Sequence, residues 1–526
     1  MKRAMALRVA SISIAATLVA CGTGTDQMSP KAVRSGFATV PKAKCGPLDR
    51  TETGLQGQTP LADRQSGATT QAYNCNLEKI GQFEGEGASW QLTWFNDCAY
   101  YDTANNNTPG PQHPGVVVVD VSDPEHPKAT NYLTAAAMMD PWESLKVNPQ
   151  RKLLGANKGP GIDFATFGPN PADKNFSFYD ITDCKNPKLL SDVPVDGHVG
   201  HTGDFSADGK TYYGTTTIAA GVTAMDISDP TKPKELLRDL QFTVHDVASN
   251  ADSTRLYGAL VAPVNGLIIM DVSDIQKRVA NPQIREVSRI TWLDGAGAQM
   301  PTPMKIKGKP YILFADESSG RAQSCAQGFT PYGLARIIDI SDEKKPVTVS
   351  KLALETHDPA NCNTTLADLA EFPGFAYDAH YCSVDNPNEA KLAACSYFQS
   401  GMRVFDIGDP ANPKEIAYYK PPARRLEYRA ASNINLSFFG PHFDHKADWS
   451  SANSRFVWHG SELHLWTTSQ DNGFQVLRFT NGVGVDTTLP KPDSGGCSSA
   501  GGSVGILAAL GLTAVLWRAR KRGRSG

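Results

Sequence analysis

Four histidines recur at corresponding places in the chain, each close to the start of a predicted repeat unit. His201 precedes GDFSADGK, His245 lies in VHDVASNAD, His380 in DAHYCSVDN and His445 in FDHKADWSS. Imidazole groups that converge on one point are typical ligands of zinc, copper or iron. The sequence therefore makes these four residues candidate metal ligands and a channel-bound transition metal the implied cofactor.

Carboxylates accompany the histidines and would orient the imidazole rings as hydrogen-bond acceptors: Asp204, Asp246, Asp378 and Asp444. Trp142-Glu143 occupies the corresponding place in another unit. The alternative is structural, because polar residues of this kind also solvate strand ends or bond neighbouring units together. The sequence leaves both interpretations open and identifies no catalytic residue.

Other motifs give no recognisable catalytic set. The chain has no GxSxG elbow, no Walker loop and no GxGxxG after a strand. DFSADG (204–209) lacks the twelfth-position ligand of a calcium loop and fits a hairpin turn. Asp316-Glu317 lies at a predicted strand end, with no sign that the two carboxylates face each other. These absences favour a binding protein over an enzyme.

A signature occurs six times and defines the elements that must position the histidines. In each copy a run of β-branched and apolar residues ends in Asp and is followed by a turn; the copies span 116–128, 176–188, 222–234, 267–274, 335–346 and 402–414. We expect the first Asp of each copy to accept hydrogen bonds from its own turn; these residues are Asp120, Asp180, Asp226, Asp271, Asp339 and Asp406. Asp274 and Asp342 are not followed by Pro, so the outer turns of the fourth and fifth units are less regular.

The third unit shows the full pattern of strand, tight turn, strand, signature strand, turn and fourth strand between residues 200 and 240. Four antiparallel strands in each unit are typical of a β-propeller blade. A degenerate seventh unit (464–482) lacks its last strand, and NLEKIGQFE (76–84) resembles the missing piece. We predict an all-β, seven-bladed propeller whose last blade is completed by an N-terminal strand. The first strand of each blade lines the channel, where the histidines would meet.

The signature resembles that of the LVIVD-repeat proteins. VVVVDVSDPEHPK carries the resemblance, as does DAHYCSVDN followed by ACSYFQSGMRVFDIGDPANPKEIAYY, and the match extends over about residues 76–480. The resemblance implies an exported bacterial β-propeller and supplies no catalytic residues.

The N-terminus predicts export. A basic start and a short apolar run over residues 1–20 are typical of a signal peptide. Leu18-Val19-Ala20-Cys21 resembles a lipobox, in which Cys21 would be lipidated; an ordinary signal peptide with an incidental cysteine is the alternative. Residues 21–44 are small and polar, which predicts a disordered tether.

The C-terminus carries a second predicted targeting signal. A linker (484–503) precedes an apolar segment (504–517), which predicts a short transmembrane helix, and a basic tail (518–526). This arrangement resembles MYXO-CTERM and GlyGly-CTERM sorting signals; a plain membrane anchor is the alternative. Both place most of the chain at the bacterial cell surface or outer membrane, with the periplasm as the second choice.

The cysteines agree with an exported location. Apart from Cys21 and Cys497, eight remain, and an even number in an exported chain predicts disulfides. We expect Cys382–Cys395 within one hairpin and Cys45–Cys75 as the bounds of an N-terminal segment (45–75) that precedes the propeller (76–483).

Two functions follow as hypotheses. The first is a membrane-anchored, surface-displayed scaffold that binds a protein, a glycan or another surface component. The second is a copper-, zinc- or iron-dependent oxidase or hydrolase with a histidine cluster in the channel. A net charge of −3 gives no basic footprint for nucleic acid.

Overall fold

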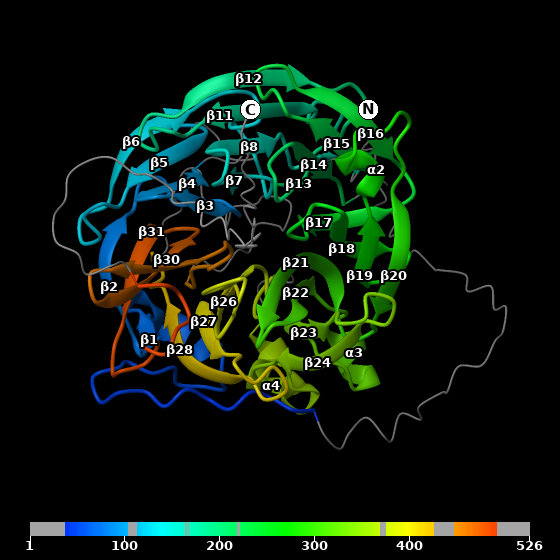
Figure 1. Cartoon of the computed structure of the whole chain (residues 1–526). Coiled ribbons are helices and arrows are strands. Elements are labelled where there is room, and N and C mark those ends of the chain that lie inside the picture. Colours follow the sequence, from blue (N-terminus) through cyan, green and yellow to red (C-terminus); the bar gives the residue numbers. More distant parts are fainter. Residues whose placement is uncertain are drawn as a thin grey trace, which may run out of the picture. The chain divides into compact units, whose positions relative to one another are not determined.

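Each repeat unit folds into one antiparallel sheet, and seven such sheets follow one another around a ring (Figure 1). This computed structural model describes residues 37–103, 113–163, 166, 168–217, 221–368, 375–424 and 446–491. The predicted seven-bladed β-propeller is confirmed. The signature forms the third strand of its blade, as expected from its apolar run.

The first four blades are built from consecutive strands. Blade 1 contains β3 (Leu92–Phe95), β4 (Cys98–Asp102), β5 (Val116–Asp120) and β6 (Lys128–Leu133). Blade 2 contains β7 (Lys146–Asn148), β8 (Leu153–Asn157), β11 (Asn175–Asp180) and β12 (Lys188–Pro194), with a small separate sheet of β9 (Ile162–Asp163) and β10 (Gly168–Pro169). Blade 3 contains β13 (Thr202–Phe205), β14 (Thr211–Thr215), β15 (Val222–Asp226) and β16 (Lys234–Asp239). Blade 4 contains β17 (Thr243–Ser249), β18 (Arg255–Ala262), β19 (Gly266–Asp271) and β20 (Arg285–Thr291).

The last three blades include the two strands from the N-terminal region. Blade 5 contains β21 (Ala296–Ile306), β22 (Lys309–Ser318), β23 (Ala335–Asp339) and β24 (Val347–Leu352). Blade 6 contains β25 (Cys382–Val384), β26 (Leu392–Ser396), β27 (Met402–Asp406) and β28 (Lys414–Lys420), with β1 (Tyr73–Cys75) as a fifth strand. Blade 7 contains β29 (Arg455–His459), β30 (Glu462–Ser469), β31 (Gly473–Phe479) and β2 (Leu77–Phe83).

Helices are short and lie between strands or before the first blade: α1 (Leu61–Ser66), α2 (Ser273–Gln276), α3 (Ala322–Gln327) and α4 (Cys362–Ala367). Single 3₁₀ turns occur at Ala68–Thr70, Glu355–His357 and Pro359–Asn361. Every helix within the described ranges is too short or too polar to cross a bilayer. The predicted signal peptide with Cys21 and the predicted C-terminal helix (504–517) lie outside the described residues.

The core lies between the blades, and β5 shows why. Its four valines are fully buried and alternate between two neighbours. Val116 and Val118 pack in a cluster with Leu154 of blade 2, whereas Val117 and Val119 belong to a cluster with blade 7. A strand covered on both faces needs a continuous apolar run, which is what the signature supplies.

The signature aspartates cap their own turns, as predicted. A side-chain oxygen of each accepts a hydrogen bond from the backbone N–H two residues further on at 2.7–3.0 Å; the residues are Asp120, Asp180, Asp226, Asp271, Asp339 and Asp406. In the fourth unit the outer turn is replaced by α2. In the fifth unit Asp342 keeps the turn, with its Oδ1 accepting from the Lys344 N–H at 3.0 Å.

The N-terminal region closes the ring and braces one blade. The predicted closing strand is confirmed, since β2 pairs with β31 from Leu77 opposite Phe479 to Phe83 opposite Phe474. Strand β1 was not expected; it pairs with β28 and gives blade 6 its fifth strand. Residues 37–44, which the sequence assigned to a tether, lie against the propeller, where Val40 is buried and donates its N–H to Ala353 O at 2.8 Å.

Four disulfides are present in the described part of the chain: Cys45–Cys75, Cys98–Cys184, Cys325–Cys362 and Cys382–Cys395. They include both of the pairs expected from the sequence. Cys98 lies in blade 1 and Cys184 in the outer turn of blade 2, so this disulfide joins two blades. Disulfides persist in oxidising compartments, and they indicate that the protein is exported.

Candidate metal centre in the central channel

Side chains from five successive blades lie close together in the channel. Glu143 precedes β7, His201 precedes β13 and His245 lies in β17. Gln299 belongs to β21 and His380 precedes β25, so each of blades 2 to 6 contributes one residue from the start of its innermost strand. Glu317, near the end of β22, joins them. We call these six residues the channel cluster.

Local irregularities aim several of these side chains. The pairing of β17 with β18 shifts register between Val244 and Val247, which brackets His245. The pairing of β21 with β22 shifts between Ala298 and Met300, which brackets Gln299. Bulges of this kind turn a side chain out of the regular alternation and are common beside active sites. The cluster therefore depends on departures from the repeat.

Glu143 is positioned by an unusual backbone. The preceding Trp142 has φ +48°, in the left-handed region that side chains rarely adopt. Glu143 then forms an isolated parallel bridge to Thr202, and its N–H donates to His201 O at 3.3 Å. Strained conformations of this kind persist where the surrounding structure holds them, often at functional sites.

Glu143 is the centre of the cluster. Its Oε2 lies 3.3 Å from His245 Nε2 and 3.9 Å from His201 Nε2, and its Oε1 lies 3.3 Å from His380 Nε2. Glu317 lies opposite, with Oε2 at 3.5 Å from His380 Nε2 and Oε1 at 3.9 Å from His245 Nε2. All three imidazoles present Nε2 to carboxylate oxygens.

Backbone carbonyls hold two of the rings from behind. His201 Nδ1 donates to Pro160 O at 2.5 Å, and His380 Nδ1 donates to Ser451 O. A carbonyl oxygen only accepts, so each Nδ1 carries a proton and Nε2 is directed toward the cluster. This is the arrangement that fixes the tautomer of metal-binding histidines.

The aspartates predicted to orient the rings have other partners. Asp246 pairs with Lys146 at 3.2 Å, and Asp378 pairs with Arg321 at 2.8 Å. For His201 and His380 the acceptors are the carbonyl oxygens, because these lie directly behind the rings. Asp444 lies outside the described residues.

Burial and mutual charge set the protonation of the cluster. Burial lowers the pKa of His245 to about 3 despite the nearby Glu143 carboxylate, and burial likewise lowers the pKa of His201. Burial also acts against the charged form of His380, but hydrogen bonds and charge from Glu143 and Glu317 outweigh it and raise its pKa to about 9. Burial would raise the pKa of Glu143, yet the neighbouring histidines hold it well below its usual range.

The cluster has no permanent positive charge of its own. Glu143, His245 and His380 are each no more than 3% exposed. Within the described ranges, no Lys or Arg forms an ion pair with Glu143 or Glu317; the nearest channel lysine, Lys146, pairs with Asp246. Buried carboxylates are costly without compensation by protons, cations or metal ions.

An aromatic wall borders the cluster. Trp90 lies 5.4 Å from Trp142 and 5.5 Å from His380 between ring centroids. Phe398 lies 5.0 Å from His380, and Trp142 lies 5.8 Å from His201. On another side Tyr381 donates its hydroxyl to Glu143 Oε2 at 3.2 Å. The wall excludes water and strengthens electrostatic interactions within the cluster.

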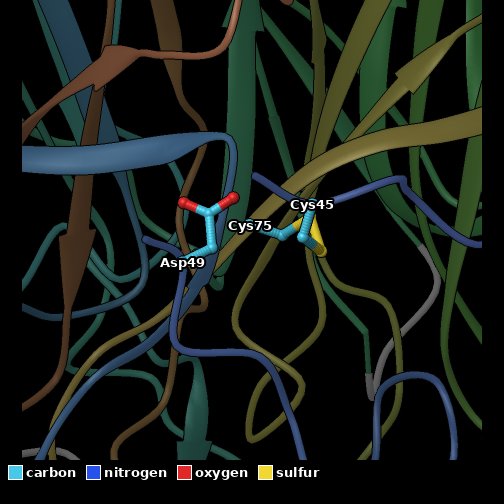
Figure 2. Close-up of side chains that lie close together, drawn as sticks. All are labelled: Cys45, Asp49 and Cys75. Atoms are coloured by element: carbon cyan, nitrogen blue, oxygen red, sulfur yellow. A yellow bond between two sulfur atoms is a disulfide. The ribbon is translucent and has the colours of Figure 1, made fainter. Parts of the chain in front are cut away.

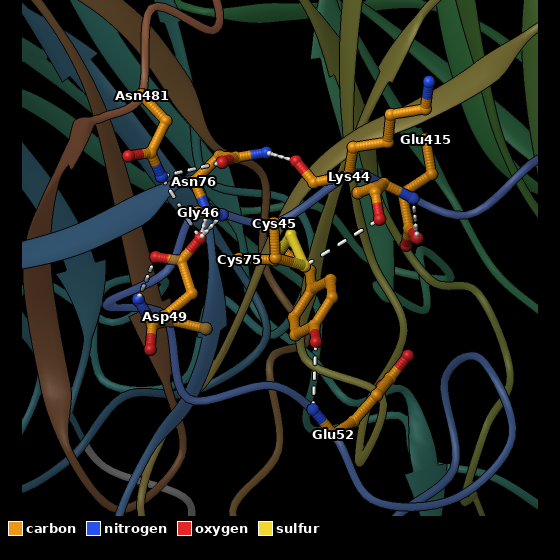
Figure 3. Close-up of a disulfide and its surroundings, with 12 residues drawn as sticks. Lys44, Cys45, Gly46, Asp49, Glu52, Cys75, Asn76, Glu415 and Asn481 are labelled. Atoms are coloured by element: carbon orange, nitrogen blue, oxygen red, sulfur yellow. Dashed lines mark hydrogen bonds between the residues drawn. A yellow bond between two sulfur atoms is a disulfide. The ribbon is translucent and has the colours of Figure 1, made fainter.

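A second group of residues with metal-ligand side chains has a structural role instead. Cys45, Asp49 and Cys75 lie together near the N-terminal region (Figure 2). Both sulfurs are used in a disulfide, and metal binding would require thiolates. Figure 3 shows Asp49 accepting from backbone N–H groups, from Gly46 at 2.7 Å and Asn76 at 2.9 Å.

The structure brings together three of the four predicted histidines. His445 lies outside the described residues. Glu143 was noted from its place in the second unit. Glu317 was considered only as a carboxylate pair with Asp316, and Gln299 was missed. Glu317 sits next to Asp316, whose Oδ2 binds Arg336 at 2.6 Å and takes no part in the cluster. The place of Gln299 at the start of the fifth innermost strand was the only available signal.

Comparison with known proteins supports the repeat. Residues 111–134 match the LVIVD repeat. The matched segment covers β5 and β6, and five further copies of the signature occupy the third strands of blades 2 to 6. A search among curated proteins finds no relative of the chain.

One similar solved structure is hydrazine synthase of Kuenenia stuttgartiensis, at 12% identity with a TM-score of 0.44. The similarity covers 76% of this chain and 97% of that one. It is too low to support an inference about function.

Proposed function

We propose that the central channel of this propeller binds a divalent transition metal ion of the zinc, copper or iron class, and that the protein's function is metal-dependent chemistry at this buried centre. The candidate ligands at this centre are His201, His245, His380, Glu143 and Glu317. The observation that carries the proposal is three imidazole Nε2 atoms directed at two carboxylates, the buried Glu143 and the partly buried Glu317, neither of which forms an ion pair with a Lys or Arg within the described ranges.

The ligand spacing supports the proposal. The contacts between His Nε2 and carboxylate oxygens span 3.3–3.9 Å. Two ligands of a tetrahedral ion with bonds of about 2.1 Å lie about 3.4 Å apart. Neutral imidazole and carboxylate ligands suit zinc, copper and iron alike, so the donor set does not select one metal.

The test is metal analysis of the exported full-length protein. We expect at least one equivalent of zinc, copper or iron in the purified protein, or after incubation with the metal and removal of the excess. His245→Ala should bind less metal than the wild type. The matched control is His464→Gln, since His464 is also buried and also contacts a glutamate, with Nε2 3.4 Å from Glu462 Oε2, but lies outside the channel.

Two outcomes would overturn the proposal. One is a folded wild-type protein that takes up none of the three metals. The other is metal uptake that His245→Ala and His464→Gln reduce equally. Far-UV circular dichroism and the midpoint of urea unfolding establish that each variant is folded.

The propeller of LVIVD-type units also fits a scaffold or binding role, because irregular loops project from rigid blades. We propose display at the bacterial surface through lipidated Cys21. A lipid precursor should label the wild-type protein and not Cys21→Ser; absence of label in the wild type would contradict this placement. Surface display and the channel metal are independent, so each test stands alone.

A further inference from the structure

The ligand atoms of the channel cluster fall into two groups. Glu143, His201 and His245 form one, and Glu143, Glu317 and His380 form the other; within each group all ligand atoms lie within 4.8 Å of one another. Only Glu143 belongs to both. The three histidines thus do not form one compact set around a single point.

Both glutamates face the two groups at once. Glu143 directs Oε2 to His245 and Oε1 to His380, at 3.3 Å each. Glu317 directs Oε1 to His245 at 3.9 Å and Oε2 to His380 at 3.5 Å. Each carboxylate therefore offers one oxygen to each side, which is the arrangement of a bridging ligand.

Since no single group holds all three histidines, at least one pair of ligand atoms in the full set is more than 4.8 Å apart, and a single ion cannot use all of these atoms as they stand. With bonds of about 2.1 Å, two ligands on opposite sides of one ion are at most about 4.2 Å apart. Two ions bridged by carboxylates, about 3.5–4 Å from each other, would serve both groups without rearrangement. The two groups of ligand atoms therefore indicate two metal ions.

Gln299 adds a neutral ligand to the second group. Its Nε2 lies 3.0 Å from His380 Nε2 and 2.8 Å from Glu143 Oε2, while its Oε1 is buried without a hydrogen-bond partner. The two ends of an amide are assigned from their partners. Rotation by 180° would place Oε1 beside His380 and Glu143, where it would bind a cation.

We propose that the channel cluster binds two divalent metal ions bridged by Glu143 and Glu317, one held by His201 and His245 and the other by His380 and Gln299. This rests on the proposed metal function and specifies its stoichiometry. Two divalent ions and two carboxylates leave a net charge of +2.

The experiment is a titration of the chelator-treated full-length protein with Zn²⁺, followed by removal of excess ion and metal analysis. We expect two equivalents in the wild type and one each in His201→Ala and His380→Ala. His464→Gln should keep two. One equivalent in the wild type would overturn the two-ion inference and leave the proposed function intact, whereas none would overturn both.

Bridging is tested separately with Cu²⁺. Two copper ions joined by carboxylates are magnetically coupled, so the electron paramagnetic resonance signal per copper should be reduced or split in the wild type. His201→Ala and His380→Ala should each show the spectrum of an isolated copper ion. Two equivalents with full, uncoupled signals would mean separate sites and would overturn the bridged arrangement.

Discussion

Two of the buried charged clusters in the described part of this propeller differ in one respect. The titratable members of the channel cluster are histidines and glutamates only, and Gln299 is its neutral member. The second cluster lies between the N-terminal segment and blade 6 and consists of Glu52, Arg403, Glu415 and Lys420; we call it the Arg403 cluster. Arg403 pairs with Glu52 at 2.5 Å and with Glu415 at 2.8 Å, and Lys420 lies 3.5 Å from Glu52.

The difference lies in the kind of positive charge. Arg403 is fully buried and always protonated, so the two carboxylates share one permanent positive charge, and the Lys420 ammonium beside Glu52 supplies the second. In the channel, neutralisation depends on a proton at His380 or on a metal ion. A permanently balanced cluster fixes the structure, whereas one that lacks a permanent cation is free to exchange protons for metal.

The largest effect is expected in the Arg403 cluster. Arg403→Met leaves Glu52 and Glu415 buried without their partner, and breaking a buried pair in this way costs about 3–5 kcal/mol of unfolding free energy. Urea unfolding monitored by tryptophan fluorescence measures the loss. Adding Glu52→Gln and Glu415→Gln to Arg403→Met should recover part of it. A loss below about 1 kcal/mol would remove the contrast between the clusters.

Metal should stabilise the protein through the channel alone. At a free metal concentration 100 times Kd, binding to the folded state adds about 2.7 kcal/mol for one site. We expect this gain in the wild type and in Arg403→Met, and a smaller gain in His245→Ala. Thermal unfolding with and without chelator gives the comparison. An equal gain in His245→Ala would place the metal elsewhere.

A histidine buried away from any carboxylate gives the next effect. His198 Nδ1 contacts Thr223 Oγ1 at 3.0 Å, and burial lowers the pKa of His198 to about 3. The unfolded chain, with an ordinary pKa of about 6.5, binds a proton that the folded state refuses, so stability falls as pH drops from about 6.5 toward 3. The loss attributable to His198 at pH 5 is about 2 kcal/mol.

His198→Gln should flatten this pH dependence, as measured by urea unfolding at pH 7, 6 and 5. His126→Gln is the control, because His126 is exposed. A pH slope unchanged by His198→Gln would show that His198 binds its proton equally well in the folded and the unfolded state.

The ring could be predicted because its signal repeats. Six copies of an apolar run ending in Asp predicted the third strands, and the resemblance of residues 76–84 to a fourth strand predicted the closure. Strand β1 was missed because Tyr73–Cys75 is too short for any alternation, and its pairing with β28 is set by tertiary contacts.

The channel cluster was only partly predictable, because several of its residues do not follow the repeat. Histidine is rare enough that its recurrence was visible in the sequence. Gln299 and Glu317 are ordinary surface residue types, and their convergence depends on the bulge between Ala298 and Met300 and on the end of β22. Side chains alternate between the two faces of a strand, and this alternation does not reveal where a bulge interrupts it. The face on which Gln299 lies therefore cannot be derived from the sequence.

The smallest effect is expected at the signature turns, which belong to neither of the two charged clusters. Asp226 is partly exposed, and its Oδ1 accepts from the Ser228 N–H at 3.0 Å and from Arg278 at 3.1 Å. Asp226→Ala removes these bonds where water can replace them, so the expected loss of unfolding free energy is about 1 kcal/mol. Asp226→Asn, which retains an acceptor oxygen, should lose less. Metal content should stay at the wild-type value in both variants, since the turn supports the blade without contacting the channel. A loss of metal in a folded Asp226→Ala protein would show that the regular scaffold and the irregular centre are coupled.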